Sequence, residues 1–150
     1  MNMGALDKPI LLVEDNPADV DLTLRAFARR RLANPVHVAR DGEEAVDWIP
    51  RWEAGETLPL LILLDLKLPR IDGLEVLARL KSHPLARKTP VVVLTTSEED
   101  KDIESAYSLG ANSYILKPVD FVKFVDVAAQ VEMYWCMLNT PPRRSMERSP

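Results

Sequence analysis

The feature that most constrains this fold is a regular alternation of short apolar runs with segments of helical periodicity. The apolar runs span residues 10–13, 36–39, 60–64, 91–94 and 113–116. Five strand–helix units in succession predict a parallel sheet that is covered by helices on both faces. Runs that are apolar throughout agree with this prediction, because parallel strands are buried on both sides. The predicted class is therefore α/β, with a doubly wound five-stranded parallel sheet and five helices.

Residues that typically begin or end helices lie between the predicted strands. Asn16 is suited to an N-cap, and Pro17 to the first position of the helix that follows. Pro50 is expected to end or kink the second helix. The last helix is predicted to run from about residue 119 to residue 138.

Length and composition indicate one domain, predicted at residues 9–138, between an N-terminal extension (1–8) and a disordered tail (139–150). The 150 residues are 47% apolar, and their net charge of −4 argues against a nucleic-acid binder that relies on positive charge. A single cysteine excludes an internal disulfide and is typical of a reducing compartment. The sequence contains neither an apolar run of the ~20 residues that span a membrane nor a signal-peptide region. We therefore expect a soluble cytoplasmic protein.

Polar side chains follow the predicted strands at the ends where parallel sheets place their sites. In chain order they are Glu14 and Asp15, then Asp65, then Thr95 and Thr96, then Lys117. Three carboxylates, a hydroxyl and an ammonium are therefore expected at one rim of the sheet. The second strand leads only into a turn at Asp41, which we interpret as structural.

This gathering of groups predicts phosphoryl chemistry. Carboxylates a few Å apart repel one another, and a divalent cation removes that repulsion. An oxygen-only set, with His37 and His83 elsewhere in the pattern, predicts Mg²⁺ rather than Zn²⁺. An ionised Asp65 can then attack phosphorus and form an acyl phosphate. Lys117 and a threonine hydroxyl can stabilise the transferred group.

Each of these residues has an ordinary structural explanation when it is taken alone. Glu14 and Asp15 can cap a helix, and Asp65 can be a turn residue. Thr95 can simply end a strand, and Lys117 can be a solvated surface charge. The prediction therefore depends on their conjunction at successive strand ends.

Four segments resemble, in order and spacing, the receiver domain of two-component response regulators. They are LLVEDNP, LLDLKLPRIDGLEVL, VVVLTT and GANSYILKPVD, and the likeness covers roughly residues 10–138. The resemblance implies the flavodoxin-like receiver fold and a phosphoryl group accepted from a sensor histidine kinase in a phosphorelay. It also implies slow self-catalysed transfer and hydrolysis, and not an enzyme that turns over a substrate.

The resemblance implies a role for each residue at the rim. Asp65 accepts the phosphoryl group, and Glu14, Asp15 and Asp65 bind Mg²⁺ together with the backbone carbonyl of Lys67. Thr95 is the switch hydroxyl, with Thr96 as the alternative. Lys117 contacts the phosphate, Tyr114 is the switch aromatic, and the peptide bond before Pro118 is cis.

A narrower resemblance is to the standalone response regulators that partner bacterial phytochromes. It is carried by NPADVDLTLRAF, VVVLTTSEEDKDI and EMYWCML. This likeness implies a red-light-sensing kinase as the phosphodonor, and dimers that are built on the last helix.

The last helix has two apolar stripes, which is more than one core-facing side requires. The stripe expected to face the core is Phe121, Phe124, Val125, Ala128, Val131, Trp135 and Leu138. The second stripe is Val122, Ala129, Met133, Cys136 and Met137. An exposed apolar stripe predicts a contact surface, for a homodimer or for kinase docking, unless the tail covers it.

Other functions stay open on the sequence alone. One is a phosphorylation-independent binding module that keeps the receiver fold without its chemistry. Another is a phosphatase of the haloacid dehalogenase type, but such enzymes need a carboxylate two residues after the nucleophile, where this chain has Lys67. Lys67 is itself either a solvated side chain or a cation near the phosphoryl site.

Overall fold

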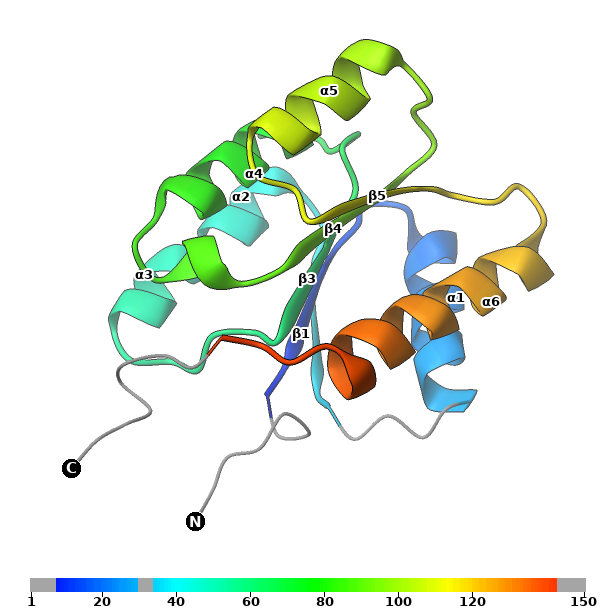
Figure 1. Cartoon of the computed structure of the whole chain (residues 1–150), viewed down its shortest axis with the longest axis horizontal. Helices are drawn as coiled ribbons and strands as arrows, with labels where there is room; N and C mark the ends of the chain where they lie inside the picture. The colour runs from blue at the N-terminus through cyan, green and yellow to red at the C-terminus, as the bar shows by residue number, and fades with distance from the viewer. Residues whose placement is uncertain (1–7, 30–33, 143–150) are drawn as a thin grey trace.

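The computed structural model describes residues 8–29 and 34–142, and five parallel strands form one sheet within them (Figure 1). The strands are β1 (Ile10–Val13), β2 (Val36–Ala39), β3 (Leu61–Leu64), β4 (Val91–Thr95) and β5 (Ser113–Leu116). Their order in the sheet is β2-β1-β3-β4-β5. Because β1 pairs with both β2 and β3, the chain changes its direction of winding between β1 and β3. The predicted doubly wound sheet is confirmed.

Helices cover both faces of the sheet (Figure 1). On one face lie α1 (Pro17–Arg29) and α6 (Phe121–Glu132). On the other lie α2 (Gly42–Val46), α3 (Trp48–Glu53), α4 (Gly73–Ser82) and α5 (Asp100–Ser108). A 3-10 turn, η2 (Ala86–Lys88), follows α4, and a π-helical segment, η3 (Met133–Leu138), continues α6. The five predicted helical segments are thus present, with the second one divided into α2 and α3.

That division falls at Asp47 and not at Pro50, which lies inside α3. A proline lacks the N–H that would bond to the carbonyl four residues earlier, and its ring clashes with that carbonyl. For Pro50 that carbonyl belongs to Val46, the last residue of α2. The helix is therefore interrupted one turn before the proline. Of the two effects expected of Pro50, an end of the helix at that residue is wrong, and a break in the regular helix is found.

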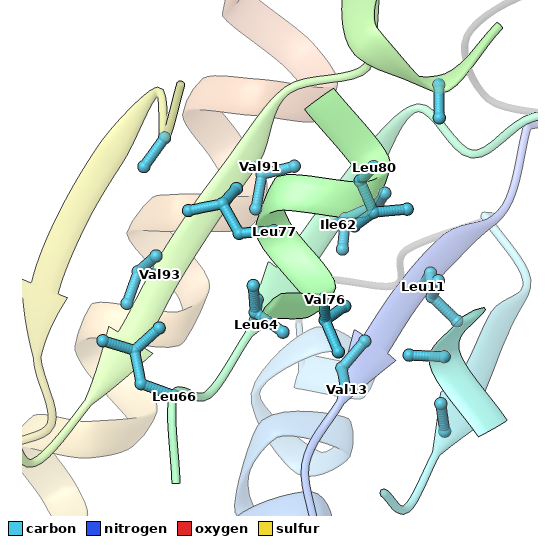
Figure 2. Close-up of a cluster of buried hydrophobic side chains, with 14 of the residues drawn as sticks. Leu11, Val13, Ile62, Leu64, Leu66, Val76, Leu77, Leu80, Val91 and Val93 are labelled. Atoms are coloured by element: carbon cyan, nitrogen blue, oxygen red, sulfur yellow. The ribbon is translucent and has the colours of Figure 1, made fainter. Parts of the chain in front are cut away.

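Alternate residues of each strand face opposite helical layers. Leu11, Val13, Ile62, Leu64, Val91 and Val93 belong to one buried cluster with Val76, Leu77 and Leu80 of α4 (Figure 2). Ile10, Leu12, Leu61, Leu63 and Val92 belong to the other, with Phe27 of α1 and Ala128 and Val131 of α6. Burial on both faces explains why the strands are apolar at every position.

The last helix differs from its predicted pattern at three residues. Phe121 and Leu138, expected in the core, are 63% and 65% exposed. Cys136, expected on the second stripe, is buried in the cluster that α1 and α6 share. Burial, and then the negative charge of Glu132, raise the pKa of its thiol to about 12.

These differences have local causes. Phe121 begins α6, before Phe124, the first buried residue of that helix. From Met133 onward the backbone forms a π-helical turn, whose hydrogen bonds run from i to i+5. The change of period rotates the residues beyond Met133 away from the stripes that a regular helix predicts.

Three further expectations concern the backbone and the chain ends. The described residues contain no cis peptide bond, so the bond before Pro118 is trans and the expected cis bond is wrong. The trans form is favoured by about 0.5–1 kcal/mol even before proline. No helix among the described residues has the length and apolar character needed to cross a membrane. Residues 1–7 of the predicted N-terminal extension (1–8) and residues 143–150 of the predicted tail (139–150) lie outside the described residues.

Candidate functional site

The candidate site lies at the carboxyl ends of β1 and β3, where the strand order reverses. Backbone hydrogen bonds carry the sheet one residue past each strand. The Glu14 N–H donates to the Ala39 carbonyl at 2.9 Å, and the Asp65 N–H donates to the Val13 carbonyl at 3.0 Å. The two acidic residues therefore have fixed backbones at the rim of the sheet.

Lys117, directly after β5, joins the carboxylates of this rim. Its Nζ lies 2.6 Å from Glu14 Oε1, 2.8 Å from Asp19 Oδ2 and 2.9 Å from Asp65 Oδ2. The Lys117 side chain is only 5% exposed, and its backbone N–H donates to the Thr95 carbonyl at 2.7 Å. A lysine ammonium has three N–H donors, so three carboxylates use its whole capacity.

Burial and hydrogen bonding act in opposite directions on the ionisation of this group. Removal from water lowers the pKa of Lys117, but hydrogen bonds to Asp19, Glu14 and Asp65 together outweigh this and raise the pKa above its ordinary value. For Glu14, burial is the largest effect and raises the pKa to about 7 in spite of the ammonium. The pocket thus holds more carboxylate than one cation neutralises.

Glu14, Asp15 and Asp65 are brought together, as the sequence predicted. One ligand oxygen from each lies within 4.8 Å of the other two. Glu14 and Asp65 are buried and Asp15 is exposed, so the cluster opens to solvent on one side. Carboxylate oxygens are the donors that Mg²⁺ and similar hard cations prefer. The donor set therefore fits a divalent cation of this class.

The second oxygen of Asp65 faces its own loop. Asp65 Oδ1 accepts a hydrogen bond from the Lys67 N–H at 3.2 Å. The exposed Lys67 ammonium lies instead 3.7 Å from Asp102 Oδ2. Lys67 is thus neither simply solvated nor paired with Asp65 through its side chain.

Thr95, the last residue of β4, is buried, and Thr96, which follows the strand, is exposed. Thr95 Oγ1 accepts the Ser97 N–H at 3.4 Å, so its hydroxyl is bonded to the loop after β4. The Tyr114 hydroxyl donates to the Ser97 carbonyl at 2.9 Å, and burial raises the pKa of this tyrosine. Thr95 and Tyr114, the two predicted switch residues, are therefore connected through Ser97.

Asp19 was missed by the sequence analysis. It stands in the first turn of α1, where an acidic residue is ordinary because it complements the helix dipole. Asn16 Oδ1 accepts the N–H groups of Ala18 and Asp19, at 2.9 and 3.3 Å, which confirms the predicted N-cap. Asp15 precedes the helix, which begins at Pro17, so no helical spacing relates Asp19 to the acidic residues of the rim.

Comparison with known proteins agrees with this geometry. The family model of the response regulator receiver domain matches residues 10–129. The probable methanogenesis regulatory protein FilR2 of Methanothrix harundinacea is 43% identical over 134 residues, which are 89% of this chain and 86% of that protein. The response regulator Rcp1 of Synechocystis is 36% identical over 137 residues, which are 90% of this chain and 93% of Rcp1.

Two crystal structures are similar to this one. The first is that of the phosphorylated cyanobacterial phytochrome response regulator RcpA, with a TM-score of 0.86 and 40% identity over 91% of this chain and 99% of that one. The second is the Mn²⁺-bound form of Rcp1, with a TM-score of 0.84 and 36% identity over 91% of this chain and 99% of that one. Fold, acidic cluster and sequence agree, and the chain belongs to the response regulator receiver family.

Proposed function

We propose that this protein is a phosphorylation-controlled receiver whose phosphoacceptor is Asp65. One observation carries the proposal above the others. A buried aspartate directly follows the central strand β3. A lysine ammonium lies 2.9 Å from one of its carboxylate oxygens, and two further acidic residues lie beside it. This arrangement supplies the nucleophile and the charge neutralisation that phosphoryl transfer needs.

The reaction starts with attack of an Asp65 oxygen on phosphorus. In transfer from a phosphohistidine, the new O–P bond forms as the P–N bond breaks, and its electron pair returns to the imidazole. Lys117 neutralises charge on the phosphoryl oxygens. Glu14, Asp15 and Asp65, with the Lys67 carbonyl, would hold Mg²⁺, which when bound offsets further negative charge. Water later hydrolyses the acyl phosphate, so the protein is a slow phosphoacceptor and not a turnover enzyme.

The proposed switch uses the contacts around Ser97. Thr95 Oγ1 now accepts the Ser97 N–H at 3.4 Å, and its O–H is a separate donor that a phosphoryl oxygen can accept. A move of the hydroxyl toward the phosphoryl group would displace the Ser97 N–H that is bonded to it. Because Tyr114 is bonded to the carbonyl of the same Ser97, a shift of this loop changes the tyrosine's position as well. Phosphorylation can thereby bias two arrangements of the face formed by β4, β5 and α5.

A phytochrome-type histidine kinase is the proposed phosphodonor. Support comes from RcpA, which is named a phytochrome response regulator and is 40% identical to this chain. FilR2, which is named for methanogenesis, is 43% identical, so kinases for other signals are the alternative donors. We propose that the reaction takes place in the cytoplasm, where a lone buried cysteine stays reduced.

Intact mass after incubation with acetyl phosphate and Mg²⁺ tests the proposal. The wild-type chain is expected to gain one phosphoryl group. Asp65→Asn, and wild type in EDTA, are expected to gain none, because the first lacks the nucleophile and the second lacks the cation. Phosphorylation that persists in Asp65→Asn would place the acceptor elsewhere. Failure of wild type with both acetyl phosphate and a phytochrome-type kinase would favour a phosphorylation-independent binding module.

We also propose that a second copy of the chain covers the exposed apolar side of α6 and η3. Of the predicted interface residues, Val122 and Met137 are 55% and 59% exposed, and Met133 is exposed as well. Ala129 is half-buried, and Cys136 is excluded because it is buried within the protomer. Exposed apolar residues along one helix are typical of a contact between proteins.

Light scattering is expected to give the mass of a dimer for the wild-type chain. Val122→Glu combined with Met137→Glu is expected to give a monomer, because each buries a charge in the contact. Ser108→Glu introduces the same charge at an exposed position of α5, on the other face of the sheet, and is expected to leave the dimer intact. A monomeric wild-type chain, with and without phosphorylation, would contradict the proposed dimer.

A further inference from the structure

Three carboxylates contact the Lys117 ammonium, and that of Asp19 has no other role in the proposed reaction. The distance between Lys117 Nζ and Asp19 Oδ2 is 2.8 Å, as short as a charge-assisted hydrogen bond. The Asp19 side chain is 21% exposed, and it approaches the ammonium from α1, outside the rim of the sheet. This contact joins α1 to the loop between β5 and α6.

The other two partners of Lys117 change their surroundings during the proposed reaction. Asp65 becomes the acyl phosphate, and Glu14 would be a metal ligand in the proposed set. Each therefore binds the ammonium more weakly once the phosphoryl group arrives. Asp19 is neither the phosphoacceptor nor a proposed metal ligand, so it can keep its contact with the Lys117 ammonium before and after transfer.

Asp19 is also held rigidly. Its backbone N–H is capped by Asn16 Oδ1 at 3.3 Å, and its carbonyl accepts the Thr23 hydroxyl at 2.8 Å. Thr23 is buried, and α1 packs against α6 through Phe27 and neighbouring apolar residues. The Asp19 carboxylate thus projects from a fixed turn of helix, as a group that orients another side chain should.

We infer that Asp19 is a positioning residue that keeps the Lys117 ammonium beside the phosphoryl site during transfer. The inference rests on the proposed phosphorylation of Asp65. A lysine has a flexible four-carbon chain, and a fixed third contact restricts its ammonium to one place. Loss of that contact is expected to slow phosphorylation, because less of the population has the ammonium in position.

The test compares two isosteric substitutions on the same helix. Asp19→Asn removes the charge that faces Lys117. Asp21→Asn removes the same charge from an exposed residue whose partner, Arg25, lies on the solvent side at 3.0 Å. Rates of phosphorylation by acetyl phosphate with Mg²⁺ are measured by intact mass, and thermal unfolding checks that each variant is folded. We expect Asp19→Asn to be about threefold to tenfold slower than Asp21→Asn, which is in the lower part of the range of coupling between residues in contact.

A double mutant shows whether Asp19 acts through Lys117. In a Lys117→Gln background, Asp19→Asn is expected to leave the residual rate unchanged, whereas a general effect of charge would persist. A rate for Asp19→Asn equal to or above that of Asp21→Asn, or an undiminished effect in the double mutant, would overturn the inference. A wild-type chain that is not phosphorylated at all would instead overturn the proposed function, and the inference with it.

Discussion

Replacing Lys117 by methionine is expected to lower the free energy of unfolding by roughly 3–5 kcal/mol near pH 7.5 without added metal. Methionine keeps most of the alkyl chain, so the change mainly removes the charge. The variant leaves the carboxylates of Glu14, Asp19 and Asp65 around an apolar side chain, two of them buried. Removing one partner of a buried ion network lowers the free energy of unfolding by more than the intact network contributes to it, because the remaining buried charges lose their counter-charge.

The size of this loss should depend on pH and on metal. Without the ammonium, the carboxylates take up protons more readily, and protonation removes their repulsion. The destabilisation by Lys117→Met is therefore expected to be largest above pH 7, the pKa region of Glu14 in wild type, and to shrink as the pH falls toward 5. Mg²⁺ is expected to restore part of the stability, because it brings positive charge to the same carboxylates.

Urea unfolding at several pH values measures this effect. Lys123→Met is the matched control, since Lys123 is an exposed residue of α6, and its replacement is expected to cost less than about 0.5 kcal/mol. Equal losses for Lys117→Met and Lys123→Met would contradict a buried ion network. So would a loss for Lys117→Met that is the same at pH 5 and pH 8.

Gly73→Ala is expected to destabilise the protein by roughly 2–4 kcal/mol, although alanine is the better helix former by about 1 kcal/mol. Gly73 is the first residue of α4 and donates its N–H to the Leu66 carbonyl at 3.1 Å. A Cβ at this position would lie 2.5 Å from the Asp65 carbonyl oxygen and 2.5 Å from the Leu66 Cα. Both are backbone atoms, so the clash is relieved only by moving the loop that carries Asp65.

Two measurements separate this clash from a general effect of removing glycine. Gly55→Ala is the control, because Gly55 has φ +106° but nothing within 4 Å of its Cβ position, and its replacement is expected to cost only about 1 kcal/mol. Phosphorylation by acetyl phosphate should slow in Gly73→Ala and stay unchanged in Gly55→Ala. A Gly73→Ala protein that is more stable than wild type would show that helix propensity outweighs the contact.

Most of the fold could be predicted from the sequence because its strands are apolar at every position. The residues of β1 and β3 have no polar side, and only a parallel sheet with helices on both faces buries such strands completely. The helix interruption at Asp47 was harder to place, because Pro50 acts on a carbonyl one turn earlier. The π-helical turn at Met133 could not be foreseen from periodicity, which assumes a regular helix, so Cys136 was placed on the wrong side.

The sequence by itself determined which chemical groups stand at the rim, because polar residues directly follow the apolar run of each strand. Glu14, Asp15, Asp65 and Lys117 follow from that rule alone. Only the tertiary structure decided that three carboxylates share the Lys117 ammonium and that Asp19 is one of them. The physical reason is the separation of these residues along the chain. Asp19 and Lys117 are brought together by the packing of α1 against α6. The local sequence around either residue carries no sign of a contact with a residue so far away.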